Sequence, residues 1–143
     1  MPHAIRFHKT GGPEVLQWEE VAVGDPGPGE ARIAHKAIGL NYIDTYHRTG
    51  LYPMPMPSGI GLEAAGVVEA VGPGVTEVKA GDRVAYCNGP IGAYSEKKIH
   101  TAERLVKLPD GITFEQAACM MLQGLTVHYL LRKLLVQPKS GDT

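Results

Sequence analysis

The spacing of apolar residues changes once along the chain, at about residue 113. Before that point, short apolar or alternating segments are separated by turns rich in glycine and proline, which is typical of β-strands. After it, apolar residues recur at the spacing of a helix. Strands followed by helices predict a mainly β fold with helices: a partly open β-barrel with a C-terminal helical segment. The expected strands are residues 4–7, 15–21, 31–38 and 105–108, with a hairpin-rich region at 61–100.

The segment 15–21 alternates between apolar and polar residues. Leu16 and Trp18 share one face, and Gln17 and Glu19 share the other. A period of two predicts a half-buried strand, so the apolar pair is expected to face the core.

The region 61–84 is predicted to form two strands joined by glycine-rich turns. Its valines suit a packed pleated surface, and the carboxylate of Glu63 stands at the mouth of the first strand. Glycine adopts backbone angles that other residues resist. Four glycines are expected to serve that purpose here: Gly66, Gly72, Gly74 and Gly81.

Asn41 supplies the first helix-start signal, and a short helix is expected at residues 42–47. The segment that follows carries Pro53, Pro55 and Pro57 at alternate positions. Each proline fixes its own φ and biases the preceding residue away from the helical region. This segment is therefore predicted to be a rigid, extended loop.

The C-terminal stretch begins with a capping-box pattern formed by Thr113 and Gln116. Gly124 is expected to interrupt the helix, with a second helix at 126–135 that ends before Pro138. Leucine-rich helices of this kind normally pack on something, yet little sequence follows them. We therefore expect a further structural element beyond this chain.

Length and composition favour one globular domain without a strong electrostatic partner. The chain has 143 residues, of which 43% are hydrophobic, and a net charge of −1. These values argue against disorder and against binding to nucleic acid or to an anionic membrane. No apolar run reaches the ~20 residues of a membrane span, and no secretory leader is evident, so a cytoplasmic protein is expected. Two distant cysteines, Cys87 and Cys119, are expected to be reduced thiols.

Eight motifs, in order along the chain, resemble the zinc-independent quinone oxidoreductase branch of the medium-chain dehydrogenases/reductases, the branch of ζ-crystallin. Each motif alone is modest, but their shared order makes the resemblance specific. The motifs lie at residues 11–16, 37–46, 50–53, 61–84, 92–94, 114–118, 124–127 and 130–133.

The resemblance implies that residues 1–112 form a GroES-like domain, like the N-terminal domain of alcohol dehydrogenases. Residues 113–143 would then connect to a Rossmann domain that is absent from this chain. Residues 59–64 formally fit a glycine-rich nucleotide fingerprint. A true fingerprint follows a strand and opens a helix. Residues 59–64 instead follow a proline-rich loop and open a strand, so they are not expected to bind a nucleotide.

No metal site is expected. Catalytic zinc needs three protein ligands of the Cys, His or carboxylate type. Where related zinc enzymes carry their ligands, this chain has Asn41, Leu62 followed by Glu63, and Gln123. None of the six histidines forms a ligand pair three or four positions apart.

The resemblance implies which residues contact NADPH and substrate. Asn41 and Tyr52 would line the substrate pocket. The residues expected to bind NADPH are Asn41, Tyr42, Ile43, Asp44, Thr45, Tyr46, Thr126 and Tyr129.

Structural interpretations remain open beside these functional ones. Asn41 also fits a helix N-cap, and Thr126 a cap of the second helix. Tyr52 also fits a surface-loop anchor for the proline-rich segment, and Tyr129 an interdomain core residue. A structural carboxylate that bonds turn amides is favoured for Glu63 over a general acid. His47 and His128 are expected at the surface or an interface.

The implied activity is hydride transfer from NADPH to a small quinone without zinc, in a full-length protein that is a homodimer. The 143-residue chain alone is expected to be inactive. A second hypothesis keeps the family but makes the substrate an enone or an enoyl thioester. A third is a non-catalytic GroES-like binding or chaperone module, against which the leucine-rich tail argues.

Overall fold

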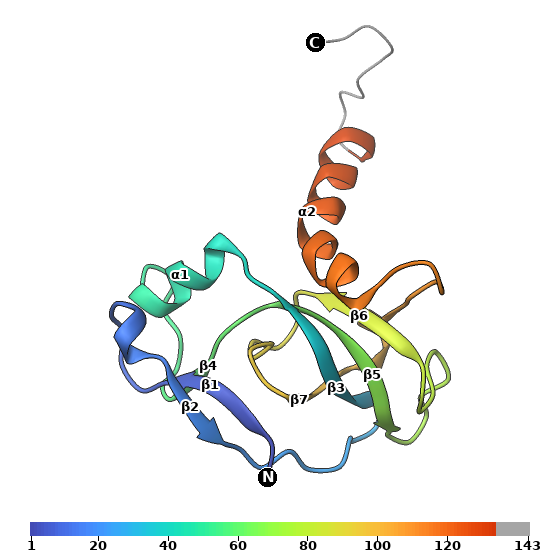
Figure 1. Cartoon of the computed structure of the whole chain (residues 1–143), viewed down its shortest axis with the longest axis horizontal. Coiled ribbons are helices and arrows are strands. Elements are labelled where there is room, and N and C mark those ends of the chain that lie inside the picture. Colours follow the sequence, from blue (N-terminus) through green and yellow to red (C-terminus); the bar gives the residue numbers. More distant parts are fainter. Residues whose placement is uncertain (134–143) are drawn as a thin grey trace, which may run out of the picture.

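Two open antiparallel sheets form the body of the molecule, and a long C-terminal helix stands out from them (Figure 1). The computed structural model describes residues 1–133. The smaller sheet has the order β2-β1-β4, and its strands are β1 His3–Phe7, β2 Gln17–Glu20 and β4 Ser58–Gly59. The larger sheet has the order β7-β3-β5-β6-β8, and its strands are β3 Glu30–Gly39, β5 Glu63–Val71, β6 Arg83–Cys87, β7 Lys97–Thr101 and β8 Val106–Lys107.

The two sheets meet along a short line rather than through a continuous ladder. Ala4 and Ser95 form a single bridge, and the Ile5 N–H donates to the Tyr94 carbonyl oxygen at 2.7 Å. The helices are α1 Tyr42–Thr49 and α2 Phe114–Arg132, with short 3-10 turns η1 Pro13–Val15 and η2 Ala102–Arg104. The prediction of a partly open, mainly β fold with a C-terminal helix is thus confirmed.

Strands β5 and β6 are buried on both faces. Successive side chains of a strand point to opposite sides, so Ala64 joins the main core while Ala65 packs beneath α2. Small side chains on that second face let the helix approach the sheet closely. The buried members of the cluster between α2 and the sheet are Ala65 and Ala85 on the strands and Ala117 and Ala118 on the helix.

Glycines in the 61–84 region serve two different purposes. Gly74 and Gly81 have positive φ values of 79° and 92°, as expected for turns that favour glycine. Gly66 and Gly72 do not, so the expectation for these two is wrong. A Cβ atom at Gly66 would overlap the Ala34 carbonyl oxygen on the neighbouring strand, and one at Gly72 would overlap another backbone oxygen. These two glycines are required by close backbone approach.

Helix α2 runs through Gly124 without interruption, which corrects the predicted break. An isolated glycine costs a helix only about 1 kcal/mol relative to alanine, less than a break in its hydrogen-bonded backbone. The predicted capping box is confirmed: Thr113 Oγ1 accepts from the Gln116 N–H at 3.1 Å, and Gln116 Oε1 accepts from the Thr113 N–H at 2.9 Å. The expected helix end at residue 135 and the stop at Pro138 lie outside the described residues.

The predicted burial of Trp18 is wrong. Val15, the first residue of the 15–21 segment, belongs to η1 and is buried, and the strand itself begins at Gln17. Strand β2 lies at the edge of the small sheet, and Trp18 remains 56% exposed. Its ring stacks on the His3 ring at a centroid distance of 5.2 Å.

Two other boundaries differ from the expected ones. Helix α1 continues to Thr49, where Gly50 with φ of 85° ends it. The last strand, expected over 105–108, is reduced to the two residues of β8, preceded by η2. Leu105 is buried just before β8, whereas Val106 within it is half exposed.

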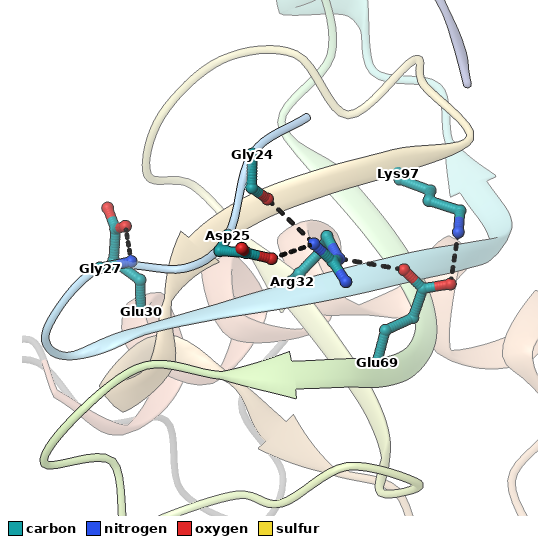
Figure 2. A network of polar contacts seen from close by, with 7 residues as sticks. All are labelled: Gly24, Asp25, Gly27, Glu30, Arg32, Glu69 and Lys97. Carbon is teal, nitrogen blue, oxygen red and sulfur yellow. Dashed lines mark hydrogen bonds and ion pairs between the residues drawn. The ribbon is translucent and has the colours of Figure 1, made fainter. Parts of the chain in front are cut away.

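A network of charged side chains holds the loop before β3 against the larger sheet (Figure 2). Arg32 donates to Asp25 Oδ1 and to the Gly24 carbonyl oxygen, both at 3.0 Å, and to Glu69 Oε2 at 3.2 Å. Glu69 Oε1 also accepts from Lys97 Nζ at 2.6 Å. Glu69 thus bridges β3 and β7 from its position on β5.

We expect Glu69→Gln to lower the free energy of unfolding at neutral pH by at most about 1 kcal/mol, because this partly exposed network is screened by solvent. The hydrogen bond from Lys97 holds the pKa of Glu69 below its ordinary value of 4.5. The carboxylate's contribution is therefore present above that value and is lost as the pH falls through the folded-state pKa. Urea denaturation of both proteins at several pH values measures this. A difference in stability that stays constant down to about pH 3 would contradict the assignment.

Candidate functional site

Three polar side chains from three separate elements meet at one end of the larger sheet. Asn41 lies at the start of α1, Glu63 opens β5, and Gln123 lies on α2. Asn41 and Glu63 are buried, whereas Gln123 is exposed. Two segments far apart in sequence therefore contact the first residue of β5.

Glu63 is the centre of this group, and its side chain is fully buried. Its Oε2 atom accepts a hydrogen bond from Asn41 Nδ2 at 2.7 Å, and its Oε1 atom accepts from the backbone N–H of Leu122 at 2.8 Å. Gln123 Nε2 donates to Asn41 Oδ1 at 3.4 Å. A buried carboxylate needs such donors because water does not reach it. The carboxylate thus accepts from a side-chain amide and a helix N–H, rather than from the turn amides that we expected.

Gly39 leaves the space in which Glu63 and α2 meet. Gly39 pairs with Glu63 across β3 and β5. A Cβ atom at Gly39 would overlap the Ala118 carbonyl oxygen and would lie 2.7 Å from Glu63 Oε2. The glycine therefore allows the first half of α2 to lie directly against the strand ends. In the sequence, only the position of Gly39 inside the 37–46 motif pointed to this close contact between β3 and α2.

The donor set of the site does not suit a catalytic metal. Two of its three side chains are amides, and both oxygens of the one carboxylate already accept hydrogen bonds. Among residues 1–133 there is no group of three or more His, Cys, Asp or Glu that could hold a metal ion.

The residues expected to contact NADPH along α1 have different surroundings. Tyr42 is 74% exposed, and its ring meets Tyr46 edge to face at 5.3 Å. Tyr46 in turn meets Tyr52 at 5.4 Å. The structure thus brings Tyr46 together with Tyr52, the residue expected in the substrate pocket. Ile43 is partly buried, and the Thr45 hydroxyl donates to the Tyr42 carbonyl oxygen at 2.6 Å.

Asp44 is buried and holds the start of α1 in place. Its Oδ2 atom accepts from the Asn41 backbone N–H at 3.0 Å and from the Tyr94 hydroxyl at 3.0 Å. Burial and, second, the Asp44 charge raise the pKa of Tyr94. Among the described residues, Asp44 Oδ1 and His47 Nδ1 are buried without a hydrogen-bond partner. His47 is therefore not at the surface, and its ring contacts Tyr52 at 6.0 Å.

Thr126 and Tyr129 lie on the projecting half of α2. Thr126 is inside the helix and donates to the Leu122 carbonyl oxygen at 2.7 Å, so the expectation of a cap at this position is wrong. Both side chains are exposed, as is His128. Large apolar side chains are also about half exposed on this helix: Met120, Leu125, Val127, Leu130 and Leu131.

A second polar cluster, formed by His35, Tyr86 and the Ser95 backbone, is separate from the Asn41 group. His35 Nδ1–H donates to the Ser95 carbonyl oxygen at 2.7 Å, and its Nε2 accepts from the Tyr86 hydroxyl at 3.0 Å. Burial lowers the pKa of His35 to about 4, so the ring is neutral at pH 7. Burial likewise lowers the pKa of Lys98 to about 8. An apolar groove of about 440 Å³ beside His35 includes neither Asn41 nor Glu63.

Known proteins similar to this chain include several oxidoreductases. Residues 27–110 match the family described as the alcohol dehydrogenase GroES-like domain. Over 144 residues the chain is 59% identical to a quinone oxidoreductase of Pseudomonas aeruginosa, covering 100% of this chain and 44% of that protein. It is 47% identical over 149 residues to a 2-haloacrylate reductase of Burkholderia, covering 99% of this chain and 44% of the relative.

Among solved structures, the Escherichia coli quinone oxidoreductase complexed with NADPH superimposes with a TM-score of 0.90 at 55% identity. The match covers 92% of this chain and 40% of the solved one. The chain thus spans less than half the length of the relatives it matches. Within residues 1–133, no helix has the length and apolar character needed to cross a membrane.

We expect Gly39→Ala to destabilise the chain by about 1–3 kcal/mol, because the added methyl group overpacks the contact between β3, Glu63 and α2. Gly24→Ala is the matched control, since a Cβ atom there has nothing within 4 Å and the residue lacks a positive φ. Its stability should stay within about 0.5 kcal/mol of the parent. Chemical denaturation monitored by circular dichroism gives both values. Equal effects of the two substitutions would exclude the proposed close contact.

Proposed function

The chain belongs to the family of alcohol dehydrogenase GroES-like domains, and we propose that it is the N-terminal domain of an NADPH-dependent quinone oxidoreductase. The observation that carries this proposal is the hydrogen-bonded set of Asn41, Glu63 and Gln123. The family resemblance implies that zinc-dependent relatives carry metal ligands near Asn41, Leu62–Glu63 and Gln123. In this chain Asn41 bonds to Glu63 and Gln123, and Glu63 also accepts from the backbone of α2. Such a site suits hydride transfer without zinc. The similarity to quinone oxidoreductases over nearly the whole chain supports the same reaction.

The proposed domain boundary lies at residue 112. Residues 1–112 make the GroES-like domain, and 113–143 lead into a nucleotide-binding domain of the full-length protein. The half-exposed apolar side chains on the projecting half of α2 support this division. Soluble proteins seldom leave such a row of large apolar groups uncovered, and the relatives are more than twice as long as this chain.

NADPH is the proposed cofactor, held in part by residues 41–46, Thr126 and Tyr129. An exposed aromatic ring suits a nucleotide with flat rings, and Tyr42 supplies one at this end of the molecule, next to the buried amide of Asn41. Asn41 and Tyr52 are proposed to line the substrate pocket, where Tyr52 offers a half-exposed ring against which a quinone can pack.

When bound, NADPH supplies the hydride. The residues of this chain align the two rings and exclude competing reactions. The oxygens of the reduced quinone take protons from water, so no protein acid is needed. Glu63 is not proposed as that acid, because both of its oxygens accept hydrogen bonds and its side chain is fully buried.

A second candidate function is the reduction of an activated carbon–carbon double bond, as in an enone or an enoyl thioester. The similarity to a 2-haloacrylate reductase favours this alternative. A non-catalytic binding or chaperone module is less well supported, because the apolar side chains of α2 would stay exposed in such a module. We further propose that the full-length protein is cytoplasmic and homodimeric, and that it binds neither nucleic acid nor membrane.

Purified full-length protein is expected to oxidise NADPH with a benzoquinone or a naphthoquinone as acceptor, whereas residues 1–143 alone should have no turnover. The reason is that the proposed nucleotide-binding domain completes the cofactor site. Loss of absorbance at 340 nm measures both rates. Activity with an enone but with no quinone would select the second candidate. NADPH-dependent turnover by residues 1–143 would refute the two-domain proposal.

Metal removal tests the zinc-free site separately. Dialysis of the full-length protein against EDTA, followed by assay in metal-free buffer, is expected to leave quinone reduction within about twofold of the untreated rate. The physical reason is that the site offers amides and a saturated carboxylate, not three zinc ligands. A loss of activity that added Zn²⁺ restores would rule out zinc independence.

A further inference from the structure

The Asn41 carboxamide has two chemically different ends, and its surroundings determine which end faces Glu63. Its Nδ2 group only donates hydrogen bonds, whereas its Oδ1 atom only accepts them, as does a carboxylate. Glu63 Oε2 lies 2.7 Å from Asn41 Nδ2. A reversed carboxamide would set two acceptors against each other in a buried position, which is costly. Asn41 Oδ1 therefore faces away from Glu63 and toward Gln123.

The Glu63 carboxylate is itself held from the opposite side. Its Oε1 atom accepts from the Leu122 backbone N–H at 2.8 Å, and the side chain is fully buried. The tight space at Gly39 adjoins its carboxylate carbon, which would lie 2.8 Å from a Cβ atom there. The acceptor that orients Asn41 is thus fixed by a helix backbone rather than by another mobile side chain.

Asn41 Oδ1 retains capacity to accept a further hydrogen bond. Asn41 forms a capping box with Asp44 at the start of α1. The side-chain donor to its Oδ1, Gln123 Nε2, is 3.4 Å away, longer than the ~2.9–3.0 Å of a typical N–H···O bond. An amide oxygen also has two lone pairs. Asn41 Oδ1 is therefore an acceptor that is turned away from Glu63, within a side chain that is 6% exposed.

We propose that Glu63 is a positioning residue that holds the Asn41 carboxamide with its acceptor turned away from Glu63, so that Asn41 receives an amide N–H from the cofactor. The carboxamide of nicotinamide carries such a donor. This inference rests on the proposed function, which gives residues 41–46 to NADPH. The same carboxylate binds the Leu122 N–H, so the orientation of Asn41 also depends on the position of α2.

Cys87 provides an internal reporter of the Glu63 charge. The two residues are directly paired across β5 and β6. Burial raises the pKa of the Cys87 thiol, and the Glu63 charge raises it further. Loss of that charge should lower the Cys87 pKa without returning it to its ordinary value, because burial is the larger cause. This pKa therefore reports the charge at position 63, whereas the Asn41 signals report the orientation of the Asn41 carboxamide.

The main test is Glu63→Gln in the full-length protein. The amide oxygen introduced at position 63 would still accept from Leu122, so its NH₂ group would face Asn41 Nδ2, donor against donor. Asn41 should then reverse its carboxamide. We expect the Kd for NADPH, measured by fluorescence titration, to rise on the order of tenfold, as for the loss of one hydrogen bond in a buried site. The side-chain amide NMR signals of Asn41 should shift as well.

Adding Gln123→Glu separates positioning from stability. The carboxylate introduced at position 123 can accept from the reversed Asn41, which completes the hydrogen bonds of the network. The double variant Glu63→Gln/Gln123→Glu should therefore recover thermal stability relative to Glu63→Gln but should not recover NADPH affinity. Each single variant is measured too, so that the coupling between the two positions is obtained from a double-mutant cycle.

Glu69→Gln is the matched control, since it changes a carboxylate to an amide on the same strand but among the Arg32 and Lys97 contacts. It should leave the NADPH Kd, the Asn41 signals and the Cys87 pKa unchanged. The proposal is overturned if Glu63→Gln leaves the Asn41 signals or the Kd unchanged, or if affinity recovers together with stability in the double variant. If the parent protein does not bind NADPH, the proposed function fails, and the Asn41 NMR signals alone decide the positioning role.

Discussion

A buried carboxylate is the constraint on which this end of the molecule depends. A charge removed from water needs hydrogen-bond donors, and an unpaired buried charge is strongly destabilising. Glu63 obtains its donors from Asn41 and from the backbone of Leu122. This requirement brings together the start of α1, the first residue of β5 and the middle of α2. Gly39 is required at the same place because no side chain fits between β3 and α2.

The two halves of α2 differ in what they pack against. Ala117 and Ala118 are buried against Ala65 and Ala85, so the first half packs on the larger sheet. The second half projects from the sheets (Figure 1). Its large apolar side chains are about half exposed. Leu122 lies between them and is tied to Glu63. In the proposed enzyme, whatever covers the projecting half is thereby coupled through one carboxylate to Asn41, the residue proposed to contact both cofactor and substrate.

Local signals in the sequence were reliable where the interaction itself is local. The capping box of Thr113 and Gln116 spans three residues and formed as expected. The prediction that Trp18 is buried was wrong, because alternation defines two faces of a strand but does not reveal that β2 lies at a sheet edge. The predicted helix break at Gly124 was wrong, because glycine weakens a helix without having to end it. The functional roles proposed for Asn41 and Tyr52 rest on family resemblance, not on any local pattern.

The sequence by itself determined the order of strands and helices, the helix starts and the family, since periodicity, caps and motif order are properties of neighbouring residues. The tertiary structure alone decided what Glu63 binds. Its partners are 22 and 59 positions away, and they reach it only through the register of β3 with β5 and the packing of α2 on alanines. The same close packing explains Gly66, whose missing side chain makes room for a neighbouring strand. Contacts between distant segments depend on how the sheets and the helix pack in space, which one-dimensional spacing does not contain.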